Sequence, residues 1–403
     1  MKKNNKTPKL RFSGYTDDWE QRKLKEIANK VSEKNKNNEF SEPFTNSAEQ
    51  GIISQKDYFD REIVNNENLD GYYIVRNDDF IYNPRISVTA PVGPINRNRL
   101  GRNGVMSPLY TVFRTHDIDN LYLEFYFKTT KWHRFMKLNG DSGARFDRFT
   151  ISSTQFMEMP IPYPTLDEQQ KIGKYFDSLD RLITLHQRKL EKLQNMKKSC
   201  LQKMFPKDGA TVPEIRFSEF QGDWEERTLG SCFDERLESL PDGELLSVTI
   251  SSGIKKFSEL DRHDNSNTDK SKYKRVCIGD IAYNSMRMWQ GASGRSPYEG
   301  IVSPAYTVVK PIGDIDTQFF AYMFKKKEII HLFEINSQGL TSDTWNLKYP
   351  AFSKIVVRVP RNVEEQSRIA RFLLELDELI SCTEQEIEIT KRMKKGCLQK
   401  MFV

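Results

Sequence analysis

The sequence repeats itself, and this repetition restricts the chain to an architecture of two similar halves. The motif Arg11-Phe12-Ser13 and the following Trp19 return near the middle of the chain as Arg216-Phe217-Ser218 and Trp224. Other segments also match between the halves, namely 79–83 with 280–284, 104–112 with 300–308, and 167–205 with 364–402. A repeat of this length predicts two tandem copies of one structural unit.

The segment that closes each copy has the pattern of a long amphipathic helix. Its apolar positions are spaced alternately by four and three residues, which is the spacing of a heptad seam. The predicted seam contains Ile172, Phe176, Leu179, Ile183, Leu190 and Leu193 in the first copy and Ile369, Leu373, Leu376, Ile380 and Ile387 in the second. His186 and Thr383 occupy equivalent polar positions in the seam, and we interpret them as markers of helix register.

Each helix has a start signal in which a cap residue lies three residues before a glutamate. Thr165 precedes Glu168 and Asn362 precedes Glu365, a spacing that predicts a capping box. Roughly 40 residues at about 1.5 Å per residue make each helix on the order of 60 Å long, so each needs a partner. The simplest partner is the other helix, in an antiparallel coiled coil. The alternative is that each helix packs only on its own domain.

The predicted fold class is α+β, with two mixed α/β globular domains joined by two long helices in a pseudo-twofold arrangement. We expect a flexible tail at 1–8, domains at 9–163 and 207–359, and helices at 164–206 and 360–403. Aromatic residues recur in both domains and are predicted to form the cores, with Trp19 and Trp224 as anchors.

Composition sets looser limits. The 403 residues, 37% of them hydrophobic, suffice for two or three domains, and the net charge of +6 is compatible with polyanion binding. The five cysteines form no Cys-x-x-Cys pair, so neither a disulfide framework nor a zinc ribbon is indicated. No apolar stretch approaches the roughly 20 residues of a membrane span. We therefore expect a cytoplasmic protein without a membrane segment.

Basic residues gather at equivalent places in the two domains. Residues 80–116 contain five arginines and no carboxylate, and residues 270–298 contain six basic residues and one aspartate. Such runs suit phosphate neutralisation and arginine contacts to guanine, although a solvated basic loop is the alternative. The candidate DNA-binding residues are Asn83, Arg85, Arg97, Arg99, Arg102, Arg145 and Arg148 in the first domain and Asn284, Arg287, Arg295, Ser342 and Lys348 in the second.

Signatures of catalysis are missing from the sequence. The segment Asn83-Pro84-Arg85-Ile86 lacks the second proline and the aromatic residue of an amino-methyltransferase turn. No glycine-rich nucleotide loop, no Asp/Glu-x-Lys nuclease pattern and no paired histidines occur, so no metal site is predicted. The sequence therefore favours binding over catalysis.

The two basic domains, each opened by Arg-Phe-Ser and closed by a Glu-Gln helix that ends in Cys-Leu-Gln-Lys-Met-Phe, resemble the specificity subunit of type I restriction-modification systems. The resemblance implies that each domain is a target recognition domain reading one half of a bipartite, asymmetric site in double-stranded DNA. It also implies that the helices set the spacer and dock two methylation subunits, which restriction subunits join. S-adenosylmethionine, ATP and Mg would belong to those partners, with no cofactor or catalytic residue in this chain.

Two other functions are compatible with the residues alone. One is a non-catalytic coiled-coil scaffold with incidental DNA affinity, and the other is an enzyme with an unfamiliar site. Salt-dependent retention on DNA separates the first from a DNA-binding subunit. Incubation with DNA, methyl donor and magnesium tests the second.

Overall fold

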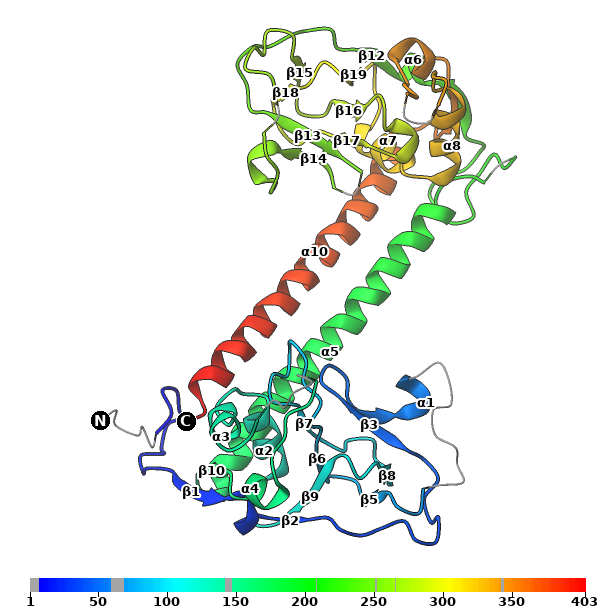
Figure 1. Ribbon diagram of the computed structural model, residues 1–403. Helices are drawn as coiled ribbons and strands as arrows, with labels where there is room; N and C mark the ends of the chain where they lie inside the picture. Colours follow the sequence, from blue (N-terminus) through cyan, green and yellow to red (C-terminus); the bar gives the residue numbers. More distant parts are fainter. Residues whose placement is uncertain are drawn as a thin grey trace. The chain divides into compact units, whose positions relative to one another are not determined.

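The computed structural model describes residues 7–58, 69–141, 147–207, 209–250, 252–264, 266–341 and 344–403. The chain divides into two compact units, unit 1 (Met1–Gln187 with Gln385–Val403) and unit 2 (Arg188–Glu384). The division passes through both long helices, α5 (Leu166–Lys203) and α10 (Val363–Lys400), so each unit holds half of each helix. We call the remaining globular part of unit 1 domain 1 and that of unit 2 domain 2 (Figure 1).

Domain 1 is built around a four-stranded antiparallel sheet with the order β2-β9-β6-β7. These strands are β2 (Ala28–Lys30), β9 (Thr111–Thr115), β6 (Phe80–Tyr82) and β7 (Ile95–Arg97). Three antiparallel pairs accompany the sheet: β1 (Glu20–Lys23) with β10 (Pro160–Tyr163), β3 (Phe44–Ser47) with β4 (Gly51–Ser54), and β5 (Tyr73–Val75) with β8 (Gly104–Met106). The helices are η1 (Leu24–Glu26), α1 (Gln55–Tyr58), α2 (Asn120–Phe127), α3 (His133–Asn139) and α4 (Ser153–Met157).

Domain 2 has the same topology. Its four-stranded antiparallel sheet has the order β12-β19-β16-β17, formed by β12 (Phe233–Glu235), β19 (Tyr306–Pro311), β16 (Ile281–Asn284) and β17 (Ser293–Arg295). The accompanying pairs are β11 (Glu225–Thr228) with β20 (Val356–Val359), β13 (Leu246–Thr249) with β14 (Gly253–Lys256), and β15 (Lys274–Val276) with β18 (Gly300–Val302). The helices are α6 (Leu229–Cys232), η3 (Phe257–Glu259), η4 (Met288–Gln290), α7 (Thr317–Met323), α8 (Lys327–Ile335) and α9 (Tyr349–Phe352).

The repeated sequence segments form the central strands of the two sheets. Residues 79–83 and 280–284 form β6 and β16, and in each domain this strand pairs antiparallel with the strand that ends the second repeated segment, β9 or β19. The register is equivalent, because Tyr82 faces Thr111 and Tyr283 faces Thr307. All residues of β6 are buried. The repeats are therefore explained by burial on both faces of a central strand.

The equivalent segments Asp117-Ile118-Asp119 and Asp314-Ile315-Asp316 begin the helices that cover the sheets. The Asp119 carboxylate accepts a hydrogen bond from the Tyr122 amide at 2.8 Å, and Asp316 accepts from Phe319 at 3.0 Å. Each aspartate is thus the N-cap that satisfies an unpaired amide of α2 or α7.

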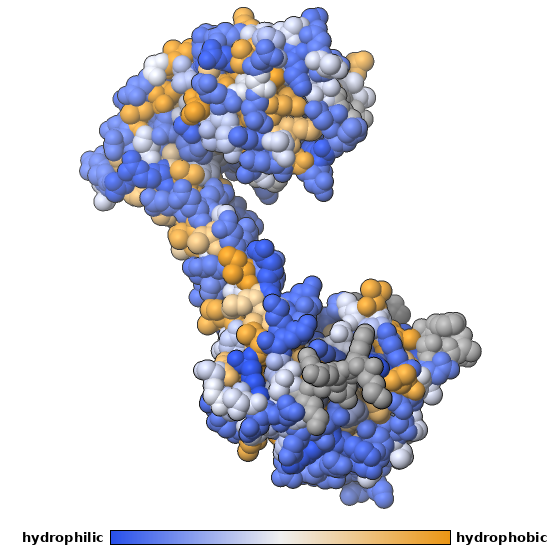
Figure 2. Space-filling view, turned by 90° about the vertical axis from the view of Figure 1, so that its left-hand side faces the viewer, coloured by the Kyte–Doolittle hydropathy of each residue, from blue (hydrophilic) through white to orange (hydrophobic). Residues whose placement is uncertain are grey.

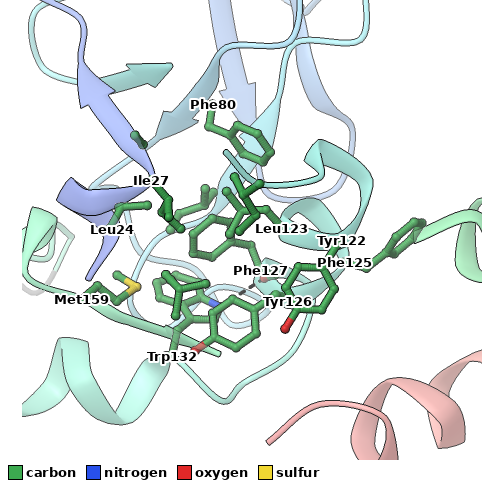
Figure 3. Close-up of a cluster of buried hydrophobic side chains, with 14 of the residues drawn as sticks. Leu24, Ile27, Phe80, Tyr122, Leu123, Phe125, Tyr126, Phe127, Trp132 and Met159 are labelled. Atoms are coloured by element: carbon green, nitrogen blue, oxygen red, sulfur yellow. Dashed lines mark hydrogen bonds between the residues drawn. The ribbon is translucent and has the colours of Figure 1, made fainter. Parts of the chain in front are cut away.

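Aromatic side chains from α2 and α7 form the cores, as the sequence predicts. In domain 1, Phe125, Tyr126 and Phe127 are nearly inaccessible to solvent, and Figure 3 shows side chains of α2 meeting Leu24, Trp132 and others. In domain 2, the equivalent Phe319, Phe320 and Tyr322 are buried. The entrance residues Trp19 and Trp224 are buried too, which confirms them as core anchors.

The long helices pack against each other antiparallel within each unit. In unit 1, Asp180 forms an ion pair with Lys394, and His186 Nδ1 lies 3.0 Å from Glu386 Oε2. In unit 2, Lys197 pairs with Asp377. All eleven apolar seam residues are buried or half-buried, which confirms the heptad prediction. The two helices thus pair as predicted, and each half-helix also packs on its own domain, as Phe176 does on Phe125.

The two polar seam residues make different contacts. His186 meets Glu386 of the opposite helix, whereas the Thr383 hydroxyl donates to the carbonyl of Leu379 one turn back in its own helix. Two lysines also lie at equivalent positions of the heptad seam, Lys197 and Lys394. The ammonium group of Lys197 lies over the ring of Tyr322, and that of Lys394 lies over the ring of Phe125. The aliphatic stems of these lysines can thus occupy an apolar seam while their charges are paired.

The Arg-Phe-Ser, Trp and Glu-Gln motifs form a lock between each domain and its long helix. The Arg11 guanidinium donates to both carboxylate oxygens of Glu168, at 2.7 and 2.9 Å, and Trp19 Nε1 donates at 3.2 Å. Arg216, Glu365 and Trp224 repeat this arrangement.

The lock corrects the capping-box prediction. The Glu168 amide donates weakly to Thr165 Oγ1 at 3.4 Å, and Asn362 Oδ1 accepts from the Glu364 amide at 2.8 Å, so the caps are present. The glutamate side chains, however, turn to the arginines instead of back to the caps. A bidentate ionic partner is stronger than a backbone amide, which explains the preference.

The first described residues of unit 1 dock on the end of α10. The Leu10 amide donates to the Lys400 carbonyl at 2.9 Å, just as the Ile215 amide donates to the Lys203 carbonyl at the end of α5. Each Arg-Phe-Ser segment therefore leaves the end of one long helix and locks onto the start of the other.

Candidate nucleic-acid interface

Three of the predicted DNA-binding arginines of domain 1 are held in ion pairs within unit 1. Arg97 donates to Glu124 at 2.8 Å and to Asp78 at 3.0 Å, and its side chain is only 10% exposed. Arg99 bridges Glu124 and Asp177 of α5. Arg97 and Arg99 stay predicted DNA contacts, but their charges are paired with carboxylates of unit 1.

Arg102 and Arg114 are also held in ion pairs with carboxylates of unit 1. Arg102 donates to both oxygens of Glu42 at 2.8 Å, and this hydrogen bond is the largest cause that lowers the pKa of the Glu42 carboxyl. Arg114 donates to both oxygens of the buried Asp79. Among the described residues, carboxylates from other parts of the fold therefore neutralise four of the five arginines in residues 80–116, all except Arg85.

The basic run of domain 2 is likewise partly neutralised. Arg295 donates to the Thr317 hydroxyl at 3.1 Å, and its side chain is half-buried. Lys274 lies 3.4 Å from Glu235, and Arg275 lies 3.3 Å from Glu238. Arg295 stays a predicted DNA contact, with one of its donors bound to Thr317.

The remaining candidates of domain 1 come together where two loops meet. The loop after β6 carries Asn83 and Arg85, and the segment before α4 carries Arg148; Arg85 and Arg148 pair as an isolated antiparallel bridge. Backbone bonds join the loops, from Phe149 to the Pro84 carbonyl at 2.7 Å and from Ile86 to the Asp147 carbonyl at 3.0 Å. Loop cluster 1 is defined as residues 83–93 with 141 and 147–150.

Loop cluster 1 presents two exposed arginines. Arg85 and Arg148 are exposed, and neither guanidinium has a carboxylate partner in the part of the chain that the structure describes. Asp141 and Asp147 are also exposed there, so the cluster combines both charges. The Asn83 amide is occupied, donating to the Asn46 carbonyl at 2.8 Å, and its oxygen accepts from the Arg85 amide. Asn83 therefore shapes the loop that presents Arg85.

Domain 2 has a loop cluster at the equivalent place. The loop after β16 carries Asn284 and Arg287, and it meets the segment that carries Lys348 through a bond from the Leu347 amide to the Ser285 carbonyl at 2.8 Å. Asn284 Oδ1 accepts from the Met286 amide, as Asn83 does in its own loop. Arg287 and Lys348 are exposed, and Arg287 makes one long contact to Gln290 at 3.3 Å. Loop cluster 2 is defined as residues 284–291 with 336–341 and 344–348.

A half-buried lysine, Lys325, supports loop cluster 2. The Lys325 ammonium donates to the carbonyls of Gly291 at 2.6 Å, Ser293 at 2.8 Å and Ile250 at 3.1 Å. Burial lowers the pKa of Lys325 to about 8, with a smaller contribution from the charge of Lys197. Gly291, at the end of the loop, adopts φ 82°, a left-handed conformation that favours glycine.

A recess of 440 Å³ adjoins Lys348. Its lining includes Ser285, Thr307 and Asn346 as well as Lys274 and Tyr306. The hydroxyls of Ser285 and Thr307 lie 2.8 Å apart, and Asn346 Oδ1 has no hydrogen-bond partner. Hydroxyl, amide and ammonium groups of this kind can contact base edges or phosphates.

Two predicted residues lie outside the described part of the chain, namely Arg145 and Ser342. Within the described residues, no group of histidine, cysteine or acidic side chains could hold a metal ion. The same residues include no helix that is both long and apolar enough to cross a membrane.

One functional candidate was missed by the sequence reasoning. Trp289 in loop cluster 2 faces Trp345 of the same cluster, and both are partly exposed. The sequence signal that could have found them was one tryptophan in each of the two loops of domain 2 that form cluster 2. Both tryptophans lie outside the aromatic runs that form the cores.

Comparison with known proteins agrees with this architecture. Residues 16–195 match the family model of the type I restriction modification DNA specificity domain. The chain is 23% identical over 330 residues to the type I restriction enzyme MjaVIII specificity subunit of Methanocaldococcus jannaschii, covering 73% of each chain. It is 24% identical to the putative MjaX specificity subunit of the same organism, in a match that spans 61% of this chain and 59% of the relative.

A solved structure has the same fold. The type I restriction-modification S subunit from M. genitalium aligns with a TM-score of 0.57 at 14% identity, over 98% of this chain and 99% of that one. Both long helices and both mixed domains fall within this alignment. By the family model over residues 16–195 and by these relatives, the chain is similar to type I restriction-modification specificity subunits.

Proposed function

We propose that this chain is the DNA-recognition subunit of a type I restriction-modification complex and that each domain binds one half of a bipartite target. The observation that carries the proposal is the pair of exposed loop clusters, which occupy equivalent positions in two repeated domains. Arg85 and Arg148 can donate to phosphate or to guanine in the major groove, and Arg287 and Lys348 can do the same in domain 2.

The two half-sites should differ in sequence because the loop clusters differ in chemistry. Cluster 1 presents two arginines, whereas cluster 2 presents one arginine, one lysine and a polar recess. The core strands and the Arg-Glu locks are alike in the two domains. Two domains with the same fold but different loops can bind two different half-sites, as an asymmetric target requires.

The long helices are proposed to dock two methylation subunits. Exposed apolar side chains lie along both helices, among charged residues, as Figure 2 also shows for the surface of the paired helices. Four of these side chains form two pairs at equivalent positions of the two helices, Leu182 with Leu379 and Met196 with Met393. Equivalent patches in the two units suit two copies of one partner.

In this proposal the chain performs no catalysis itself. The methylation subunits would bind S-adenosylmethionine and methylate adenine, and restriction subunits, where present, would use ATP and Mg. The loop clusters offer arginine, lysine and amide groups, which recognise DNA but do not form a general acid-base or nucleophile constellation.

Genome-wide mapping of methylated adenines with and without this gene tests the proposal. We expect one bipartite, asymmetric motif to lose methylation when the gene is deleted and to regain it on complementation. An unchanged methylation map would contradict a DNA-recognition function and would favour the alternative of a scaffold with incidental DNA affinity.

Replacing Arg85 and Arg148 together by alanine is expected to weaken binding of the assembled methylation complex to its target. A lost base contact costs about 1–3 kcal/mol and affects half-site 1 alone. A lost phosphate contact instead weakens all sequences and lowers the salt slope by about 0.9. Binding to duplexes with either half-site scrambled, measured at several salt concentrations, distinguishes these outcomes.

The matched control for this double variant is Arg102→Ala. Arg102 belongs to the same domain but is already paired with Glu42, so its removal should leave the affinity for DNA nearly unchanged. If Arg102→Ala weakens binding as strongly as the double variant does, the assignment of loop cluster 1 is wrong.

A further inference from the structure

Two of the five tryptophans of the chain stand apart from its cores. Trp19, Trp132 and Trp224 are between 2% and 4% exposed, whereas Trp289 and Trp345 are partly exposed. The rings of Trp289 and Trp345 meet edge to face, with centroids 5.3 Å apart and an interplanar angle of 76°. They come from the two different loops of cluster 2, and neither belongs to the buried core of domain 2.

Hydrogen bonds of the two loops position the tryptophan pair. Trp289 Nε1 donates to the Met286 carbonyl at 3.0 Å, and Lys325 holds the Gly291 carbonyl at the end of the same loop. Trp345 precedes Asn346, which pairs with Gln338 through backbone bonds in both directions. A partly exposed aromatic surface that is fixed before binding loses little conformational entropy on contact with a partner.

The surroundings of the pair favour an anionic partner with apolar surface. Arg287 and Lys348 are exposed in the same cluster, and the Met286 side chain is 46% exposed beside them. DNA offers this combination, since phosphates alternate with deoxyribose along the backbone and thymine presents a methyl group in the major groove. Aromatic residues and arginine are also the side chains that contribute most at binding surfaces.

Domain 1 has no equivalent feature among its described residues. The aromatic residue in the described part of loop cluster 1 is Phe149, which is buried in the core of that domain. Cluster 1 instead presents the two unpaired arginines, Arg85 and Arg148. The two domains therefore offer different kinds of contact at equivalent positions.

We propose that Trp289 and Trp345 form an apolar contact through which domain 2 binds the sugars and base edges of its own half-site. This inference rests on the proposed function. The apolar part of the contact releases no counterions, so its contribution to affinity does not depend on salt.

Fluorescence of the specificity chain tests this proposal in the assembled complex. The chain is labelled with 5-hydroxytryptophan before reconstitution with unlabelled methylation subunits, so its emission is observed separately. We expect DNA with an intact half-site 2 to change the emission, because the other three tryptophans are buried. DNA with only half-site 1 intact should leave the emission nearly unchanged.

Affinity measurements on two variants give the second test. Trp345→Ala should weaken binding to the full target roughly tenfold, a magnitude typical of an aromatic contact, and should leave the salt slope unchanged. Trp345→Phe should retain most of the affinity. Leu237→Ala, an exposed apolar residue of domain 2 outside the cluster, serves as the control, and thermal unfolding of each variant confirms folding.

The outcomes separate this inference from the function on which it rests. If Trp345→Ala binds the target like the wild type, while scrambling either half-site still abolishes binding, the tryptophan contact is wrong and the proposed function stands. If the substitution impairs assembly with the methylation subunits instead, the pair contacts protein and the inference is also wrong. Wild-type binding that ignores both half-sites would overturn the function itself.

Discussion

Replacing Arg216 by alanine is expected to lower the free energy of unfolding of unit 2 by about 3–5 kcal/mol. The change leaves the Glu365 carboxylate, whose side chain is 2% exposed, without its bidentate partner. The indole of Trp224 remains as a donor at 3.2 Å but cannot neutralise the charge. Chemical denaturation measures the loss, and hydrogen exchange should locate it in domain 2 and the first turns of α10.

The control for Arg216→Ala is Arg275→Ala in the same domain. Arg275 lies 3.3 Å from Glu238, and both side chains are well exposed, so this ion pair should contribute about 0–1 kcal/mol. Equal effects of the two substitutions would show that the lock contributes no more than a surface ion pair. In that case the repeated Arg-Phe-Ser and Glu-Gln motifs would need another explanation.

Replacing Phe402 by alanine should destabilise unit 1 by about 3–5 kcal/mol, the usual cost of removing a buried phenylalanine ring. Phe402 is 2% exposed, and its ring stacks on Phe176 of α5 and contacts Tyr122 and Tyr126 of α2. The substitution therefore removes a contact shared by both long helices and the domain. Hydrogen exchange should show lost protection in α2 and in the first turns of α5.

Leu138→Ala provides the comparison for Phe402→Ala. Leu138 lies in α3 of the same unit and is 74% exposed, so its truncation should change stability by less than about 0.5 kcal/mol. Unchanged exchange in α2 after loss of the Phe402 ring would mean that the end of α10 is not part of the core of unit 1.

The fold could be predicted from the hydrophobic periodicity of the sequence because this periodicity reflects which residues are buried. The alternation of four and three along the closing segments predicted the helix seam, and Ile172, Phe176 and Leu373 are buried there. The repetition of the sequence predicted two domains of one topology, since the repeated segments are the buried strands and helix starts. Aromatic residues at equivalent places were correctly assigned to the cores.

The candidate interface was less predictable than the fold. The sequence supplied the two loops that meet in each domain, and Arg85 with Arg148 and Arg287 with Lys348 are indeed brought together. It did not reveal that Arg97, Arg99 and Arg102 were already paired. Nor did it reveal that two loops would bring Trp289 against Trp345.

By itself, the sequence determined the local features: the repeat, the helix periodicity, the caps and the residues that avoid water. The tertiary structure alone decided which charges are neutralised. The run of arginines is neutralised by carboxylates that lie outside it in the sequence, namely Glu42, Glu124 and Asp177. Likewise, Glu168 binds Arg11 although the two residues are far apart in the sequence. The physical reason is that a charge interacts through space with whatever the fold places within a few ångströms, and separation along the chain does not report that distance.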